Sequence, residues 1–136
     1  MVKSIYPVFM TEKLGESALF YKTYFGFVET FSSDWYMSLK HPDGGELALI
    51  DATHKSVFAE YRSNVRGLIL NIEVDNATQM YDDIRKQNNS IVIMELRDEA
   101  WGQRHFMVQD PNGILVAVIE EIPPSEEFQK NYTEEV

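Results

Sequence analysis

The 136-residue sequence predicts an α+β fold of two tandem βαβββ modules, whose curved mixed sheets enclose a concave cavity and carry their helices outside. The first observation is a repeated segment: "HPDGGELALID" at 41–51 aligns with "DPNGILVAVIE" at 110–120. The second is that a strand and an amphipathic helix precede each copy in the same order. The third is that strands such as "ILVAVI" barely alternate, which is typical of sheets covered on both faces.

Each copy of the repeat begins with a Pro-Asx-Gly turn and continues as an apolar strand, a pattern that predicts a β-hairpin. The same offset, extended backwards, places Met37 on Phe106 and Leu39 on Val108, so the preceding strands correspond as well. The aligned pairs are Pro42 with Pro111, Gly44 with Gly113, Ala48 with Ala117, Ile50 with Ile119, and Asp51 with Glu120.

Upstream of its hairpin, the first module is expected to have a strand over 4–10 and a helix over 14–27. Gly26 stands where a C-terminal helix cap belongs. The expected apolar stripe of this helix consists of Leu14, Ala18, Leu19, Tyr21 and Phe25.

The second module repeats this order, with a strand over 67–74 and a helix over 76–89. Asn76 is the expected N-cap of that helix. Its buried stripe is expected to be Ala77, Met80, Tyr81 and Ile84, and the three further strands are expected at 91–96, 103–109 and 114–121.

We therefore expect one domain over 1–122, with modules at 4–51 and 66–122 joined by a linker at 52–65. Pro123 and Pro124 end the fold, and the acidic tail at 123–136 is expected to be frayed or to form a short helix.

The amino-acid composition excludes some classes of function and argues against others. The chain has no cysteine, which excludes disulfides, thiolate catalysis and cysteine-based metal sites. Its net charge of −10 argues against nucleic-acid binding, and it fits either plain solubility or a preference for cationic ligands. No signal peptide and no stretch of about 18 apolar residues is present, so we expect a cytoplasmic protein that does not bind membranes.

The segments "LFYKTYFGF" at 19–27 and "WGQRHFMVQDPNG" at 101–113, placed in duplicated modules, resemble the vicinal oxygen chelate superfamily. This superfamily holds glyoxalase I, extradiol dioxygenases, and fosfomycin- and bleomycin-resistance proteins. The resemblance covers about residues 4–122 and implies the fold rather than one activity.

In catalytic members a divalent metal is held by His or Gln from the first strand of each module and by Glu from the last. The resemblance places these positions at Tyr6, Ala48, Ile69 and Ala117. Two alanines and an isoleucine supply no donor, and the high pKa of a tyrosine makes Tyr6 a poor single ligand. We therefore expect no metal and no cofactor.

The three histidines differ in setting. His41 is expected to be a solvated turn residue and His54 a surface residue, whereas His105 lies mid-strand beside the predicted cavity. His105 either contacts a ligand or is packed and hydrogen-bonded.

Aromatic residues stand beside acids in two segments, "FSSDWYM" at 31–37 and "ELRDEAWGQRH" at 95–105. Such pairs suit a planar, cationic guest, although Phe31, Trp35 and Trp101 are also compatible with ordinary packing. Packing explains Trp101 less readily, because it stands in a loop between polar residues rather than in an apolar run. The predicted ligand-binding residues are Tyr6, Phe31, Trp35, Tyr36, Ala48, Ile69, Trp101, His105 and Ala117.

Three hypotheses follow. The leading one is a metal-free protein that sequesters an aromatic or cationic small molecule, similar to the bleomycin-resistance subgroup, which matches Trp101-Gly102 and implies a homodimer. The second is a glyoxalase-like isomerase or lyase in which Tyr6 or His105 acts as the acid–base group. The third is a protein whose cavity is filled by its own side chains and which works through protein contacts.

Overall fold

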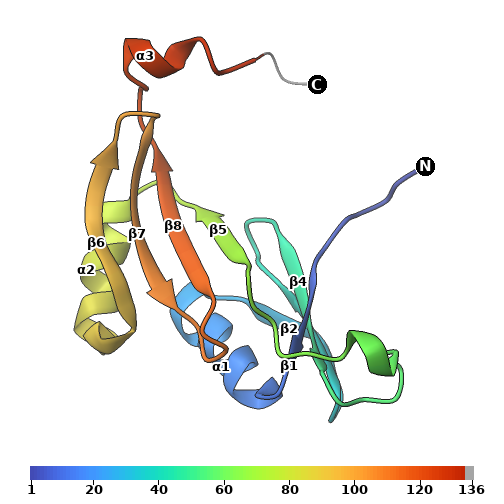
Figure 1. Cartoon of the computed structure of the whole chain (residues 1–136). Coiled ribbons are helices and arrows are strands. Elements are labelled where there is room, and N and C mark those ends of the chain that lie inside the picture. The colour runs from blue at the N-terminus through green and yellow to red at the C-terminus, as the bar shows by residue number, and fades with distance from the viewer. Residues whose placement is uncertain (134–136) are drawn as a thin grey trace. The chain divides into compact units, whose positions relative to one another are not determined.

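The computed structural model describes residues 1–133 and divides into two compact units, each with a four-stranded mixed sheet (Figure 1). Among the described residues, unit 1 comprises 1–68 and the turn at 110–114, and unit 2 comprises 69–109 and 115–133. The predicted α+β fold of two tandem βαβββ modules is confirmed. Neither sheet is closed, and the cavity expected from the sequence stays a prediction.

In unit 1 the strand order is β1-β4-β3-β2, in which β1 runs parallel to β4 and the other pairs are antiparallel. The sheet begins only after Pro7, which lacks the backbone N–H that a ladder needs, so the first strand is shorter than expected. The elements are β1 (Val8–Thr11), α1 (Leu14–Phe25), β2 (Val28–Ser32), β3 (Tyr36–Lys40), β4 (Glu46–Asp51) and the 3₁₀ turn η1 (Ala59–Tyr61).

Unit 2 repeats this topology, with strand order β5-β8-β7-β6 and one parallel pair, β5 with β8. The repeat detected in the sequence is therefore a repeat of sheet topology. The elements are β5 (Ile69–Glu73), α2 (Ala77–Asn88), the 3₁₀ turn η2 (Asn89–Ile91), β6 (Val92–Glu99), β7 (Gln103–Gln109), β8 (Leu115–Glu121) and α3 (Glu126–Gln129).

Both predicted helix caps are confirmed. Gly26 ends α1 in the left-handed conformation at φ 73°, and its N–H donates to the Lys22 carbonyl. The Asn76 side chain accepts from the Gln79 N–H at the start of α2.

The predicted stripe of α1 was wrong at Leu19, which is 61% exposed. The buried face is centred on Tyr21, and Ser17 and Phe20 belong to it. Leu19 lies two residues before Tyr21, about 200° away around the helix axis, and therefore points to the opposite side. In α2, Ala77 and Ile84 are buried, while Met80 and Tyr81 are half-buried.

A buried polar network fixes the turn at 110–114 inside unit 1. The Tyr21 hydroxyl donates to Asp110 Oδ2 at 2.8 Å, and Asp110 Oδ1 accepts from the N–H groups of Asn112 and Ile114. The Asn112 amide donates to Ser17 Oγ at 3.0 Å. Burial, reinforced by the Asp110 charge, raises the pKa of Tyr21 far above its usual range, so its hydroxyl stays a donor.

The C-terminal tail contains the short helix α3, one of the two forms expected for it; residues 134–136 lie outside the described part of the chain. Within the described residues, no helix combines the length and apolarity needed to cross a bilayer.

Candidate functional site

Each sheet has one face packed against its helix and one face without a helix. Phe9 of β1 contacts Tyr21 of α1, with ring centroids 6.3 Å apart, and Phe106 of β7 contacts Tyr81 of α2 at 5.1 Å. Residues that alternate with Phe9 and Phe106 along their strands therefore lie on the helix-free faces. Predicted site residues are found on both of these faces.

The helix-free face of unit 1 brings together Tyr6, Phe31, Tyr36 and Ala48. Ala48 pairs with Val8 on one side and Ser38 on the other, and the Phe31 and Tyr36 rings are 6.1 Å apart. Burial, followed by the charge and the hydrogen bond of Tyr6, raises the pKa of Tyr36. The result is a surface of aromatic rings and hydroxyl groups.

Trp35 has a different environment. Its indole stacks on the His54 imidazole with centroids 3.8 Å apart and planes 7° apart. His54, expected at the surface, is half-buried, because one face of its imidazole is covered by the indole. Trp35 therefore has a packing partner in unit 1, and its contact with a ligand stays a prediction.

The helix-free face of unit 2 carries a histidine that is hydrogen-bonded to a carboxylate. His105 is 4% exposed, and its Nε2 lies 2.8 Å from Glu99 Oε2, an atom that also accepts from Arg97 Nε at 2.8 Å. The hydrogen bond from His105, and then that from Arg97, lowers the pKa of Glu99. Glu99 is therefore a carboxylate at neutral pH and can hold His105 in one orientation.

Trp101 lies in the turn between β6 and β7 and contacts the His105 ring. Its ring centroid is 6.2 Å from that of His105 at 81°, an edge-on contact, and its Nε1 donates to Gln103 Oε1 at 2.9 Å. Trp101 is 40% exposed. Ile69 and Ala117 lie on the same face of this sheet, so unit 2 brings together four of the predicted residues.

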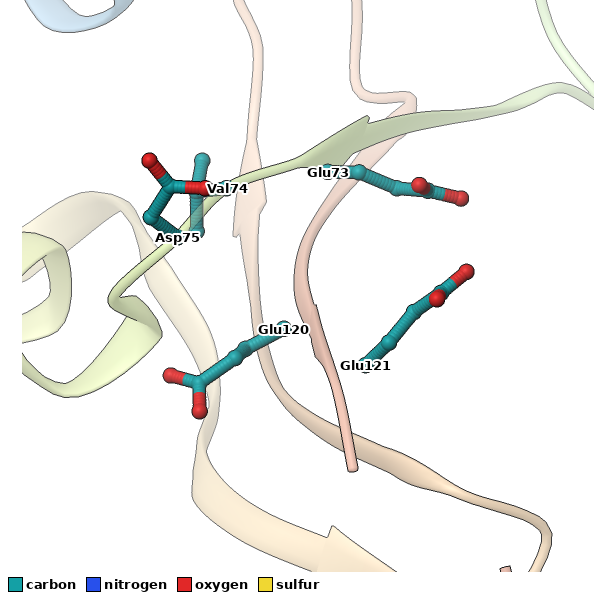
Figure 2. A pocket seen from close by; sticks show the side chains of 5 residues that line it. All are labelled: Glu73, Val74, Asp75, Glu120 and Glu121. Atoms are coloured by element: carbon teal, nitrogen blue, oxygen red, sulfur yellow. The ribbon is translucent and has the colours of Figure 1, made fainter. Parts of the chain in front are cut away.

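An acidic hollow of about 450 Å³ opens at the end of β5 and β8, lined by Glu73, Val74, Asp75, Glu120 and Glu121. Figure 2 shows the carboxylates of Glu73 and Glu121 pointing the same way, with those of Asp75 and Glu120 turned away from them. Glu120 accepts from the Ala77 N–H at 3.1 Å, at the start of α2, and lies 3.6 Å from Arg104 Nη1.

None of the predicted site residues lines this hollow, although the signal for it was in the sequence. Glu73 follows Ile69 by four residues and Glu121 follows Ala117 by four. Strand alternation therefore puts these two carboxylates on the predicted face. Glu73 and His105 both pair with Ile119, so the acids, the histidine and an apolar floor share one surface.

Two tandem βαβββ modules, each with an open mixed sheet packed by a helix on one face, define a protein of the glyoxalase-fold class. A family model described as the Glyoxalase/Bleomycin resistance protein/Dioxygenase superfamily matches residues 6–118. The chain belongs to this superfamily, as its motifs indicated. No curated protein matches the sequence.

Solved structures share the fold at low sequence identity. A glyoxalase/bleomycin resistance protein/dioxygenase family enzyme from Burkholderia phytofirmans PsJN superposes with a TM-score of 0.72 at 16% identity, covering 86% of this chain and 97% of that one. A protein of unknown function from Agrobacterium tumefaciens C58 gives 0.67 at 20% identity, covering 90% and 96%. At these identities the likeness shows the fold alone.

The residues that the resemblance places at the superfamily's metal positions do not form a ligand set. Ala48 pairs with Val8 and Ala117 with Asn71, so the two buried alanines occupy equivalent places in the two modules. Tyr6 and Ile69 lie two residues before these partners and are equivalent in turn. Across residues 1–133, no group of three or more His, Asp or Glu side chains is placed to hold a metal ion. The donors present do not fit the superfamily metal.

Proposed function

We propose that this protein is a metal-independent binding protein that captures a planar, cationic small molecule on the helix-free face of unit 2. The observation that carries the proposal is the juxtaposition on one sheet of Trp101, the His105–Glu99 pair and the carboxylates of Glu73 and Glu121. Capture would be stoichiometric, with no bond made or broken.

The helix-free face of unit 2 combines several groups that complement a planar cation. The indole of Trp101 offers a π-system to stack or to attract a cation, worth about 0.5–2 kcal/mol according to its desolvation. Ile69, which is 55% exposed on the same face, offers apolar surface that a flat guest would remove from water. Glu73 and Glu121 add Coulomb attraction, and the chain's net charge of −10 favours the approach of a cation.

The absent ligand set supports binding over superfamily metal chemistry. Ala48 and Ala117, both buried, have methyl groups where the resemblance places the carboxylates of chelating members. A homodimer and a cytoplasmic location, which the resemblance and the composition imply, stay predictions.

Calorimetric titration with ethidium, a planar aromatic cation, tests the proposal. The anionic dye 1-anilinonaphthalene-8-sulfonate is the comparison ligand of opposite charge. We expect ethidium to bind and the anion to bind far less. Trp101→Ala should weaken ethidium binding about tenfold, because one aromatic or cation–π contact is worth about 1.4 kcal/mol. Tyr61→Ala, which removes a 69% exposed ring in unit 1, is the matched control and should leave the affinity unchanged. Equal affinity for both dyes, or an unaffected Trp101→Ala variant, would contradict the proposal.

One observation favours a second candidate, an isomerase or lyase that uses His105 as a general base. The 2.8 Å contact between His105 Nε2 and the Glu99 carboxylate is the arrangement that orients a catalytic imidazole. Proton abstraction next to a carbonyl is readily measured as exchange of the α-hydrogens of hydroxyacetone with D₂O by NMR. This candidate requires exchange above the buffer rate that disappears in His105→Ala and persists in His54→Ala. Exchange at the buffer rate in the wild type would rule it out for this substrate class.

A further inference from the structure

Trp101 is held by a part of the chain that lies beyond the matched superfamily region, which ends at residue 118. Helix α3 follows β8 and lies beyond the turn between β6 and β7 (Figure 1). Phe128 of α3 presents its ring to Trp101 with centroids 6.4 Å apart at 77°. The indole is therefore in edge-on contact with both His105 and Phe128.

The backbone of the Trp101 turn is bonded to the same C-terminal segment, defined here as residues 122–133. The Ile122 N–H donates to the Gly102 carbonyl at 3.0 Å, and the Ser125 N–H donates to the Ala100 carbonyl at 2.8 Å. The Tyr132 hydroxyl donates to the carbonyl of Trp101 itself. Each of the three turn residues is thus tied to the segment by a separate hydrogen bond.

The turn also has a shape that only glycine satisfies. Gly102 has φ +109°, and a Cβ at this position would stand 2.9 Å from the Ile122 carbonyl oxygen and 3.2 Å from the Tyr132 hydroxyl. The absence of a side chain is what lets the C-terminal segment approach. The segment is therefore closely packed on the turn.

We propose that the C-terminal segment is part of the ligand site, with Phe128 and Tyr132 as positioning residues that hold Trp101 edge-on to His105. This inference rests on the proposed function, and it deepens it: the segment sets the orientation of the aromatic wall and so determines which planar cations fit. Phe128 acts through ring packing, and Tyr132 acts through its bond to the Trp101 carbonyl.

The test starts without any ligand. The chain has two tryptophans, so a Trp35→Phe background leaves Trp101 as the sole reporter. In this background, Phe128→Ala should abolish most of the near-ultraviolet circular dichroism of Trp101 and raise its quenching by acrylamide. Tyr132→Phe should do so in part, and Phe128→Tyr should restore the wild-type signals. Phe58→Ala, which truncates a 76% exposed ring in the linker, is the control and should change neither signal.

The second arm repeats the ethidium titration on the same variants. We expect Phe128→Ala to bind ethidium up to about tenfold more weakly, the equivalent of about 1.4 kcal/mol, and Phe128→Tyr to rescue binding. Unchanged Trp101 signals in Phe128→Ala would overturn the positioning role. Altered signals with unchanged ethidium affinity would overturn the assignment of the segment to the site. Failure of the wild-type protein to bind ethidium would instead overturn the proposed function, while the ligand-free signals still decide whether the segment positions Trp101.

Discussion

Replacing Asp110 by alanine is expected to lower the free energy of unfolding by roughly 3–5 kcal/mol, a large part of the 5–15 kcal/mol typical of a domain. The substitution removes the acceptor of the Tyr21 hydroxyl and of two backbone N–H groups. Tyr21 is 0% exposed, so its hydroxyl finds no water in place of the carboxylate. Urea unfolding followed by circular dichroism measures the loss. Tyr21→Phe, which removes one donor and leaves the turn capped, should cost about 1–2 kcal/mol.

The repeat itself provides the matched control. His41 occupies the place of Asp110 in the first module, and its Nδ1 accepts from the Asp43 N–H at 3.0 Å, as Asp110 Oδ1 accepts from the Asn112 N–H at 2.8 Å. His41→Ala therefore removes the turn cap without leaving a buried hydroxyl unpaired, and it should cost about 1 kcal/mol or less. Equal losses in the two variants would show that capping, rather than the buried network, explains the role of Asp110.

Much of the fold was predictable because its signals are local. A Pro-Asx-Gly turn needs only neighbouring residues to form, and the helix caps at Gly26 and Asn76 act within one turn of their helices. Repetition of these local signals made the two modules visible in the sequence.

The contacts between distant segments were not predictable in the same way. Tyr21 and Asp110 belong to two separate sequence motifs that are 89 residues apart. No periodicity of hydrophobic residues within either motif predicts their contact. The direction of Leu19 and the stacking of Trp35 on His54 depend likewise on what the rest of the chain brings near. Tertiary packing determines these side-chain directions and contacts, and it overrides local conformational preference.

The candidate site also contains both features that are predictable from the local sequence and a contact that depends on tertiary structure. The duplication predicted that His105 and Ala117 line one site, and the strand register puts both on one face together with Glu73 and Glu121. The pairing of His105 with Glu99, by contrast, depends on the register between β6 and β7, which contains two irregularities. A shift of one residue would turn the Glu99 carboxylate to the other face of the sheet.

Substitution of Gly102 by alanine is expected to cost roughly 3 kcal/mol and to displace the C-terminal segment from Trp101. Two effects add. At φ +109° any L side chain is strained by about 1–3 kcal/mol, and the new Cβ would stand 2.9 Å from the Ile122 carbonyl oxygen, closer than carbon and oxygen tolerate. Backbone atoms cannot rotate away as a side-chain tip would, so the segment itself must move. Urea unfolding measures the cost, and the fluorescence of Trp101 in the Trp35→Phe background reports the displacement.

Gly44 separates the two effects. It has φ +116°, nearly the same strained conformation, yet nothing lies within 4 Å of the place its Cβ would take. Gly44→Ala should therefore cost only the backbone strain, about 1–2 kcal/mol, with no change at Trp101. The difference between the two variants measures the close approach of the C-terminal segment alone. If both lose the same stability and neither alters the Trp101 signal, the segment does not depend on the space that Gly102 leaves, and the packing argument for its role at the site fails.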